Sequence, residues 1–292
     1  MKVKDLLKSG RPCISFEFFP PKTEEGLATL LSTIATLKEL SPTFVSMTYG
    51  AGGSTRSKTV ALVSRIKNQI GIEAVAHLTC VGHTKEELRS VLEELQAGGV
   101  ENVLALRGDP PKGQASFTRP AGGFAYASEL VEFIRENFRF SVGVAGYPEK
   151  HPEATSLEED LQRLKGKVDR GADYVITQLF FSNADYFSFV TRLRKMGVNV
   201  PIIPGIMPVT DTEQAKRFTS LCGAKVPPGL LEKLERAGAD KAAVGEIGVA
   251  HATAQCEELL RNGAPGVHFY TLNRSDATRE VFRRLKLAGV VK

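Results

Sequence analysis

The sequence predicts an α/β fold: a (β/α)8 TIM barrel with extra helices between strands seven and eight. Three observations predict it. About eight short apolar segments alternate with amphipathic helical segments along all 292 residues. The apolar segments are short and often β-branched, as strands of a parallel sheet buried on both faces are. Polar residues and Gly/Pro turns collect at one end of these segments, as they do at the C-terminal face of a barrel.

The first of these observations assigns the strands in order. The eight expected strands span residues 14–19, 44–49, 73–79, 102–107, 141–146, 174–180, 200–206 and 266–270. An open doubly wound sheet is the alternative, but it would more often carry a GxGxxG motif after its first strand, and none is present there. Eight strand–helix units therefore favour a closed barrel.

The helices fall between these strands, and residues 84–97 show the pattern best. Thr84 is the expected N-cap, Glu87 completes a capping box, and Gly98 ends the helix. One face of this helix is apolar, formed by Leu88, Val91, Leu92 and Leu95.

The stretch from residue 211 to residue 262 is too long for one helix. We expect two or three helices there, around the breaker Pro227-Pro228-Gly229. No linker-like or low-complexity stretch divides the chain, so residues 1–292 are expected to form a single barrel domain.

Composition narrows the classes of partner. The formal charge of +5 fits an anionic ligand, but Lys and Arg are scattered rather than massed, which argues against nucleic acid. The N-terminus lacks a signal peptide and no apolar run could span a membrane, so a cytoplasmic protein without a membrane partner is expected. The four cysteines show no CxxC spacing and the histidines no paired spacing, so neither a disulfide framework nor a metal site is expected.

One carboxylate at a strand end is a candidate proton donor. Glu17 lies among aromatic residues in Phe16-Glu17-Phe18-Phe19-Pro20-Pro21, at the end of the first strand. Desolvation by these neighbours would raise its pKa, as a general acid near neutral pH requires. The alternative is that Glu17 points outward on a strand edge while the aromatics form core.

The other strand ends add polar groups, each with a structural alternative. His77 could be a core histidine, Arg107 and Asp109 could form an ion pair, and Gln178 could bond a neighbouring loop. Because such groups gather at one end of every strand while the opposite ends are plain, the pattern favours an enzyme.

Taken together, these strand-end phrases resemble the methylenetetrahydrofolate reductase family in its short bacterial form, without the C-terminal regulatory domain of eukaryotic members. The ordered match runs from about Leu6 to Leu285. Its phrases are Phe16-Glu17-Phe18-Phe19-Pro20-Pro21, Val45-Ser46-Met47-Thr48-Tyr49-Gly50-Ala51, His77-Leu78-Thr79-Cys80, Leu104-Ala105-Leu106-Arg107-Gly108-Asp109, Tyr147-Pro148-Glu149, His151-Pro152-Glu153, Ile176-Thr177-Gln178, Ile203-Pro204-Gly205-Ile206 and His268-Phe269-Tyr270-Thr271-Leu272-Asn273-Arg274.

The resemblance implies a flavin-dependent reductase. Its cofactor would be noncovalent FAD, and NADH or NADPH would give a hydride to the flavin and leave. Methylenetetrahydrofolate would then take the same place and receive the hydride in a ping-pong reaction, giving 5-methyltetrahydrofolate for methionine synthesis and one-carbon metabolism. Family members are commonly dimers or tetramers, so a homo-oligomer is expected.

The resemblance also implies roles for individual residues. Glu17 matches the acid that protonates N10 of the folate, and Asp109 matches the aspartate near the flavin and the pterin. The matches to substrate-binding residues are Glu17, Asp109, Gln178, Gln214, Phe218 and Arg274. The matches to FAD-binding residues are Thr48, Tyr49, Ala51, His77, Arg107, Gly108, Asp109, Tyr126, Ala127, Tyr147, His151, Asp160 and Lys167.

Two positions depart from the family pattern. Arg163 and Gly166 stand on the helix that carries Asp160 and Lys167, where the family pattern has different polar contacts, so the sequence leaves open whether these two positions contact the diphosphate. Asp160 and Lys167 are seven residues apart and share one helix face.

Two other functions remain open on the sequence alone. One is a barrel aldolase or pterin methyltransferase without flavin, and the other is a folate-binding barrel without turnover. Bound flavin would separate the reductase from both. The preference for NADH or NADPH is also open, because the nicotinamide of this family lies over the flavin without a Rossmann fingerprint.

Overall fold

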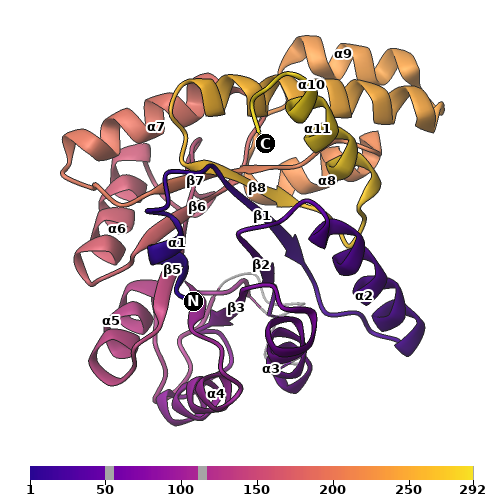
Figure 1. Ribbon diagram of the computed structural model, residues 1–292. Helices are drawn as coiled ribbons and strands as arrows, with labels where there is room; N and C mark the ends of the chain where they lie inside the picture. The colour runs from indigo at the N-terminus through magenta and orange to yellow at the C-terminus, as the bar shows by residue number, and fades with distance from the viewer. Residues whose placement is uncertain (50–55, 111–116, 292) are drawn as a thin grey trace.

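The computed structural model describes residues 1–49, 56–110 and 117–291, and Figure 1 shows its arrangement. Eight parallel strands close into a barrel in the order of the chain, with β1 hydrogen-bonded to β8. The strands are β1 (Cys13–Phe18), β2 (Phe44–Met47), β3 (Ala74–Thr79), β4 (Asn102–Leu106), β5 (Ser141–Gly146), β6 (Tyr174–Leu179), β7 (Ile202–Ile206) and β8 (Gly266–Tyr270). The predicted (β/α)8 barrel is confirmed.

Apart from the short first helix, which lies across the N-terminal end of the barrel, the helices surround the barrel and cover its outer face (Figure 1). They are α1 (Val3–Leu6), α2 (Glu24–Lys38), α3 (Arg56–Arg65) with the π-helical turn η2 (Ile66–Ile70), α4 (Lys85–Ala97), α5 (Ala127–Asn137), α6 (Leu157–Asp169), α7 (Asn183–Lys195), α8 (Thr212–Cys222), α9 (Pro228–Ala237), α10 (Lys241–Arg261) and α11 (Asp276–Leu287). Three of them, α8, α9 and α10, lie between β7 and β8, as predicted.

Local sequence rules set several of these boundaries. The Thr84 hydroxyl accepts from the Glu87 amide and the Glu87 carboxylate accepts from the Thr84 amide, so the predicted capping box at α4 is confirmed. α9 begins at Pro228, where a missing N–H costs no helical hydrogen bond. β7 begins two residues later than expected, after Pro201, which has no N–H to donate to a strand ladder.

Strand β1 shows how side chains divide between the two faces of the barrel wall. Phe16 and Phe18 pack in the layer between the strands and the helices, beside Leu30 and Ile34 of α2. Since successive strand residues alternate, Glu17 points to the barrel interior. The prediction that the flanking phenylalanines wall off this carboxylate is therefore wrong, because they lie on the opposite face of the strand.

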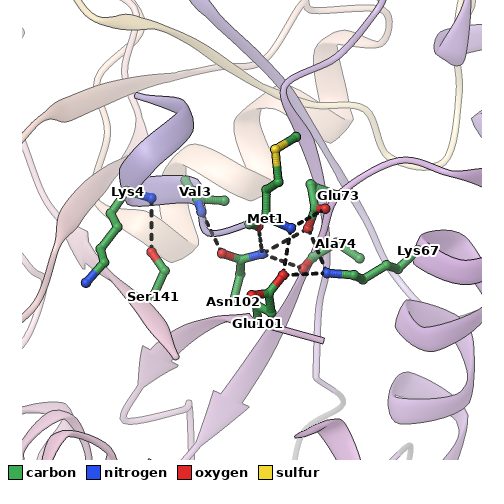
Figure 2. Close-up of polar contacts among 9 residues, drawn as sticks. All are labelled: Met1, Val3, Lys4, Lys67, Glu73, Ala74, Glu101, Asn102 and Ser141. Atoms are coloured by element: carbon green, nitrogen blue, oxygen red, sulfur yellow. Dashed lines mark hydrogen bonds and ion pairs between the residues drawn. The ribbon is translucent and has the colours of Figure 1, made fainter. Parts of the chain in front are cut away.

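The N-terminal end of the barrel is closed by the first residues of the chain (Figure 2). Asn102, fully buried on β4, accepts from the Val3 amide at 2.7 Å and donates to the Met1 carbonyl at 3.1 Å. The Lys4 amide donates to Ser141 Oγ at 3.1 Å. One buried side chain therefore fastens the N-terminal segment beneath the strands.

Replacing Asn102 by Ala is expected to destabilise the fold. The Val3 amide would lose its buried acceptor, which costs about 2 kcal/mol and lowers Tm by roughly 4–6 °C. Differential scanning calorimetry would measure the shift. Asn262→Ala is the matched control, since the side chain of this exposed Asn bonds, among the described residues, to the Glu258 carbonyl in the last turn of α10. Equal Tm values for the two variants would contradict the assigned role of Asn102.

The described ranges hold neither a membrane-spanning helix nor a cluster of metal ligands. None of the helices there is both long enough and apolar enough to cross a bilayer. Three or more His, Cys, Asp or Glu side chains do not converge anywhere in the described part as metal ligands would.

Candidate active site

A cavity of about 830 Å³ opens at the C-terminal ends of the strands. This volume lies in the range typical of small-molecule and cofactor sites. Most of the predicted site residues line it, from β1 round to α6 and β6: Glu17, Thr48, Tyr49, His77, Arg107, Gly108, Asp109, Tyr126, Ala127, Tyr147, His151, Asp160, Lys167 and Gln178.

Four predicted residues are not placed there. Gln214 and Phe218 lie on α8 and Arg274 is exposed after β8; none of the three lines the cavity. Ala51 falls outside the described residues. Arg163 and Gly166, for which the sequence left diphosphate contact open, line the cavity.

Glu17 lies at the base of the cavity, between two histidines from neighbouring strands. Its Oε2 atom is 3.4 Å from Nε2 of His77 on β3 and 3.5 Å from Nε2 of His268 on β8. The side chain of Glu17 is 18% exposed, while His268 is fully buried. Glu17 thus faces the cavity on one side and two imidazoles on the other, and the alternative of an outward edge residue is wrong.

These histidines change the expected acidity of Glu17. Burial acts to raise the pKa of this carboxyl, but the electrostatic influence of His77 and His268 outweighs burial, so its pKa is lowered. The predicted rise is therefore wrong for the chain by itself. Burial also lowers the pKa of His77, which favours the neutral form of that ring.

The end of β1 is fixed by the turn that follows β8. Thr271 Oγ1 donates to the Glu17 carbonyl at 2.6 Å, and the Asn273 side chain both donates to and accepts from the Phe19 backbone, at 2.9 and 3.0 Å. Leu272 and Asn273 adopt left-handed φ angles of 52° and 59°, which Leu in particular adopts at a cost. The Thr271-Leu272-Asn273 turn therefore positions Glu17 through its own backbone.

Cationic side chains gather at the opposite end of the cavity. Lys167, Arg163 and Arg170 project from α6 and its C-terminus. Lys167 Nζ donates to the Ala145 carbonyl at 2.7 Å, and no carboxylate of the described residues lies within 4.0 Å of it. Burial lowers the pKa of Lys167 to about 8, against the opposing charge of Asp160. This lysine is a half-buried cation without a closely paired anion in the described part of the chain.

The turn after β4 brings a further arginine and a required glycine to the cavity. Arg107 forms a bidentate pair with Glu153, at 2.5 and 2.7 Å, so the alternative ion pair with Asp109 is wrong. Gly108 has a φ of +88°, and a Cβ there would lie 2.5 Å from Val81 Cγ1. Only glycine fits this position, which lets the backbone turn so that Asp109 reaches the cavity.

The sequence interpretation missed His268, Tyr270 and Arg170 as site residues. Tyr270 lines the cavity and donates from Oη to the Thr177 carbonyl at 2.7 Å. Strand alternation could have found the first two, since His268 and Tyr270 are two residues apart and face the interior together. Arg170 follows the end of α6, and only the fold shows that it reaches the cavity.

Comparisons with known proteins support one family. The family model of methylenetetrahydrofolate reductase matches residues 2–286. The chain is 42% identical to "Methylenetetrahydrofolate reductase (NADH) 1" of Arabidopsis thaliana over 93% of its length, and spans about half of that relative, 48%. It is 40% identical to 5,10-methylenetetrahydrofolate reductase of Escherichia coli, covering 94% of this chain and 91% of the relative.

Solved structures agree on the barrel fold. A Clostridium thermocellum protein that binds two copies of 5-methyl-5,6,7,8-tetrahydrofolic acid superposes with a TM-score of 0.62 at 17% identity, over 98% of this chain and 97% of that one. A dihydropteroate synthase from Coxiella burnetii, in complex with pteroic acid, gives a TM-score of 0.54 at 10% identity over 96% and 93% of the two chains. At these identities the likeness concerns the fold alone.

Proposed function

Because the chain belongs to the methylenetetrahydrofolate reductase family, we propose that it reduces 5,10-methylenetetrahydrofolate to 5-methyltetrahydrofolate, with FAD as cofactor and NADH or NADPH as reductant. The observation that carries the proposal is one cavity with Glu17 at its base and a cationic wall at its far end. The barrel would work as one domain in a cytoplasmic homo-oligomer, and its product would feed methionine synthesis.

The residues of the far wall fit the FAD diphosphate. Lys167 offers an ammonium that no carboxylate of the described part neutralises within 4.0 Å, and Arg107, paired with Glu153 before FAD binds, lines the same cavity. Charge-assisted hydrogen bonds to phosphate are among the strongest available to a protein. We assign the diphosphate to Lys167 and Arg107, with Asp160 fixing the neighbouring loop by accepting from the His151 amide at 2.9 Å. When bound, FAD would carry the hydride from the nicotinamide to the folate.

The residues at the base fit the folate. Opening the imidazolidine ring to the N5 iminium needs a proton on N10, and Glu17 is the carboxyl group at the cavity base that can deliver it. Asp109 would hydrogen-bond the pterin and stabilise the positive iminium. Gln178, on β6, would orient the pterin through its amide, which now accepts from the Leu179 amide at 2.8 Å.

The acidity of Glu17 would then depend on the folate itself. A flat ring stacked over the cavity base would exclude water from the exposed side of this carboxyl, and desolvation raises the pKa of a carboxyl. Glu17 would therefore be ionised before the folate binds and protonated in the complex. The bound folate would therefore raise the pKa of Glu17, rather than the apolar neighbours expected from the sequence.

The flavin spectrum tests the proposed function. Purified protein, or protein incubated with FAD, should be yellow, and anaerobic NADH or NADPH should bleach it. Methylenetetrahydrofolate should then restore the colour. A protein that stays colourless after incubation with FAD would contradict the proposal and favour a flavin-free aldolase, a methyltransferase or a folate-binding barrel.

Replacing Asp109 by Asn is expected to slow folate reduction more than flavin reduction. The substitution keeps the shape of the side chain but removes the charge that stabilises the cationic iminium, a loss of roughly 10²-fold in rate. Stopped-flow absorbance would measure the two half-reactions separately. A larger loss in the nicotinamide half-reaction would contradict the role given to Asp109.

A further inference from the structure

Polar side chains concentrate on one side of the barrel interior beneath the cavity. The inward residues of β1, β2, β3 and β8 at this level are Ser15, Ser46, His77 and His268. Across the barrel the inward positions include the apolar Leu104, Ile176 and Ile203, and Tyr174 is the one among them that carries a hydroxyl. Buried polar side chains cost free energy unless they are hydrogen-bonded, so a polar sector directly under one carboxylate requires a reason.

His268 is held from both sides within this sector. Its Nδ1 atom is 2.8 Å from Ser15 Oγ, and its Nε2 atom faces Glu17 Oε2 at 3.5 Å. The Phe44 ring stacks on the imidazole at 5.9 Å between centroids, and Tyr270 packs edge-on at 5.5 Å. The ring can therefore neither rotate nor withdraw from Glu17 without breaking these contacts.

The contact with Ser15 selects one tautomer of His268. An ionised carboxylate only accepts hydrogen bonds, so the imidazole nitrogen facing it must carry the proton. Nδ1 is then unprotonated and accepts from the Ser15 hydroxyl at a normal O–H···N length. The competing acceptor of Ser15, the Val267 carbonyl, is farther away at 3.4 Å.

His77 differs from His268 because it lines the cavity, whereas His268 does not. Nε2 of each ring lies close to Glu17 Oε2, at 3.4 and 3.5 Å, and neither nitrogen has another hydrogen-bond partner within the described residues. The titratable groups that face Glu17 are thus His77 from β3 and His268 and Tyr270 from β8, while β2 contributes the hydroxyl of Ser46. Of these groups, His268 combines complete burial with a second, fixed partner.

We propose that His268, oriented by Ser15, is a positioning residue that holds Glu17 Oε2 and donates a hydrogen bond to the ionised carboxylate. The proposal deepens the proposed function and rests on it for its catalytic consequence. His268 would stabilise the carboxylate that remains after the proton has moved to N10 of the folate. It would also keep the other oxygen of Glu17, Oε1, free to face the cavity.

Carbon-13 NMR of glutamate-labelled protein tests the proposal without flavin or folate. The Glu17 carboxyl resonance is the one missing from Glu17→Gln. His268→Leu should raise the apparent pKa of Glu17 by about one unit, a tenfold change in proton affinity, because the donor is lost. His268→Gln, whose amide N–H can reach the same place, should restore most of the wild-type value. Unchanged titration in His268→Leu would overturn the proposal.

Two serines in the same layer provide a matched pair. Ser15→Ala should raise the pKa of Glu17 in the same direction as His268→Leu but by less, since the ring loses only the partner that fixes its tautomer. Ser46→Ala removes an equally buried hydroxyl that has no hydrogen-bond partner in the described part, and should leave the titration unchanged. Equal effects of the two serine variants would overturn the role of Ser15. The two serine variants also test the proposal if His268→Leu does not fold.

The folate half-reaction supplies the catalytic arm of the test. The rate of folate reduction should fall at high pH, where Glu17 loses its proton. In Ser15→Ala this fall should move to higher pH, because Glu17 keeps its proton longer, while reduction of the flavin by NADH stays unchanged. If the wild-type protein neither binds flavin nor reduces folate, the proposed function alone would be refuted, because the NMR titration tests the role of His268 independently. If the wild type turns over folate but the fall in rate at high pH does not move in Ser15→Ala, the inference alone would be refuted.

Discussion

Glu17→Gln is expected to retain FAD, to accept reducing equivalents from NADH at the wild-type rate, and to reduce methylenetetrahydrofolate roughly 10²–10⁴-fold more slowly. The amide has the size of the carboxyl group but cannot donate an acidic proton to N10. Its neighbours His77 and His268 would still contact its oxygen, so the cavity should keep its shape. Anaerobic stopped-flow absorbance of the flavin measures both half-reactions.

The lowered pKa of Glu17 adds a second measurable result. The carboxyl is ionised at neutral pH in the chain by itself, so it must gain a proton when the folate covers it. Folate binding near neutral pH should take up as much as one proton per site in the wild type and none at this site in Glu17→Gln. Calorimetry in buffers of different ionisation enthalpy would show the difference.

Glu149→Gln is the matched control for this variant. Glu149 is a half-buried carboxylate at the same end of the barrel, where it accepts from the Lys225 amide, but it does not line the cavity. Glu149→Gln should leave the rates of both half-reactions close to those of the wild type. If Glu17→Gln instead reduced folate at a near wild-type rate, Glu17 would not be the acid.

Lys167→Met is expected to weaken FAD binding by roughly 10–100-fold, the value of a hydrogen bond to a charged group. Methionine keeps an unbranched apolar side chain of similar length but removes the ammonium. Fluorescence titration of the apoprotein with FAD would give the affinity. Lys165→Met is the matched control, because Lys165 is on the same helix but pairs with Asp169 at 2.6 Å and does not line the cavity.

The pKa of Lys167 also predicts how affinity depends on pH. Burial lowers this pKa to about 8, so the ammonium is protonated below that value and loses its charge above it. A bound diphosphate favours the charged form and raises the pKa again. FAD affinity should therefore fall as pH rises above about 8, by at most tenfold per pH unit, and level off above the pKa of the complex. A fall of equal steepness in Lys167→Met would contradict this assignment.

Much of the fold could be predicted because it follows local rules. The eight apolar strands, the Thr84 capping box and the helix break before Pro228 each depend on residues close together in the chain. β7 begins two residues later than predicted, because Pro201 has no N–H to donate to a strand ladder. The gathering of strand ends followed from barrel closure, since parallel strands place all their carboxyl ends on one face.

The environment of each site residue could not be predicted in the same way. The aromatic neighbours of Glu17 in the chain are not its neighbours in space, because strand alternation sends Phe16 and Phe18 to the opposite face. Its true neighbours, His77 and His268, come from positions 60 and 251 residues further along the chain. Likewise Arg107 pairs with Glu153 from the loop after β5 rather than with Asp109 two residues away.

The sequence by itself therefore determined which groups are present at the strand ends, and so indicated the family and the chemistry that we propose for it. The tertiary structure decided how Glu17 ionises. The physical reason is that a pKa depends on charge, hydrogen bonding and solvent within a few ångströms, and those surroundings come from three separate strands. A hexapeptide can indicate an acid, but closure of β8 against β1 supplies the histidine that sets its proton affinity.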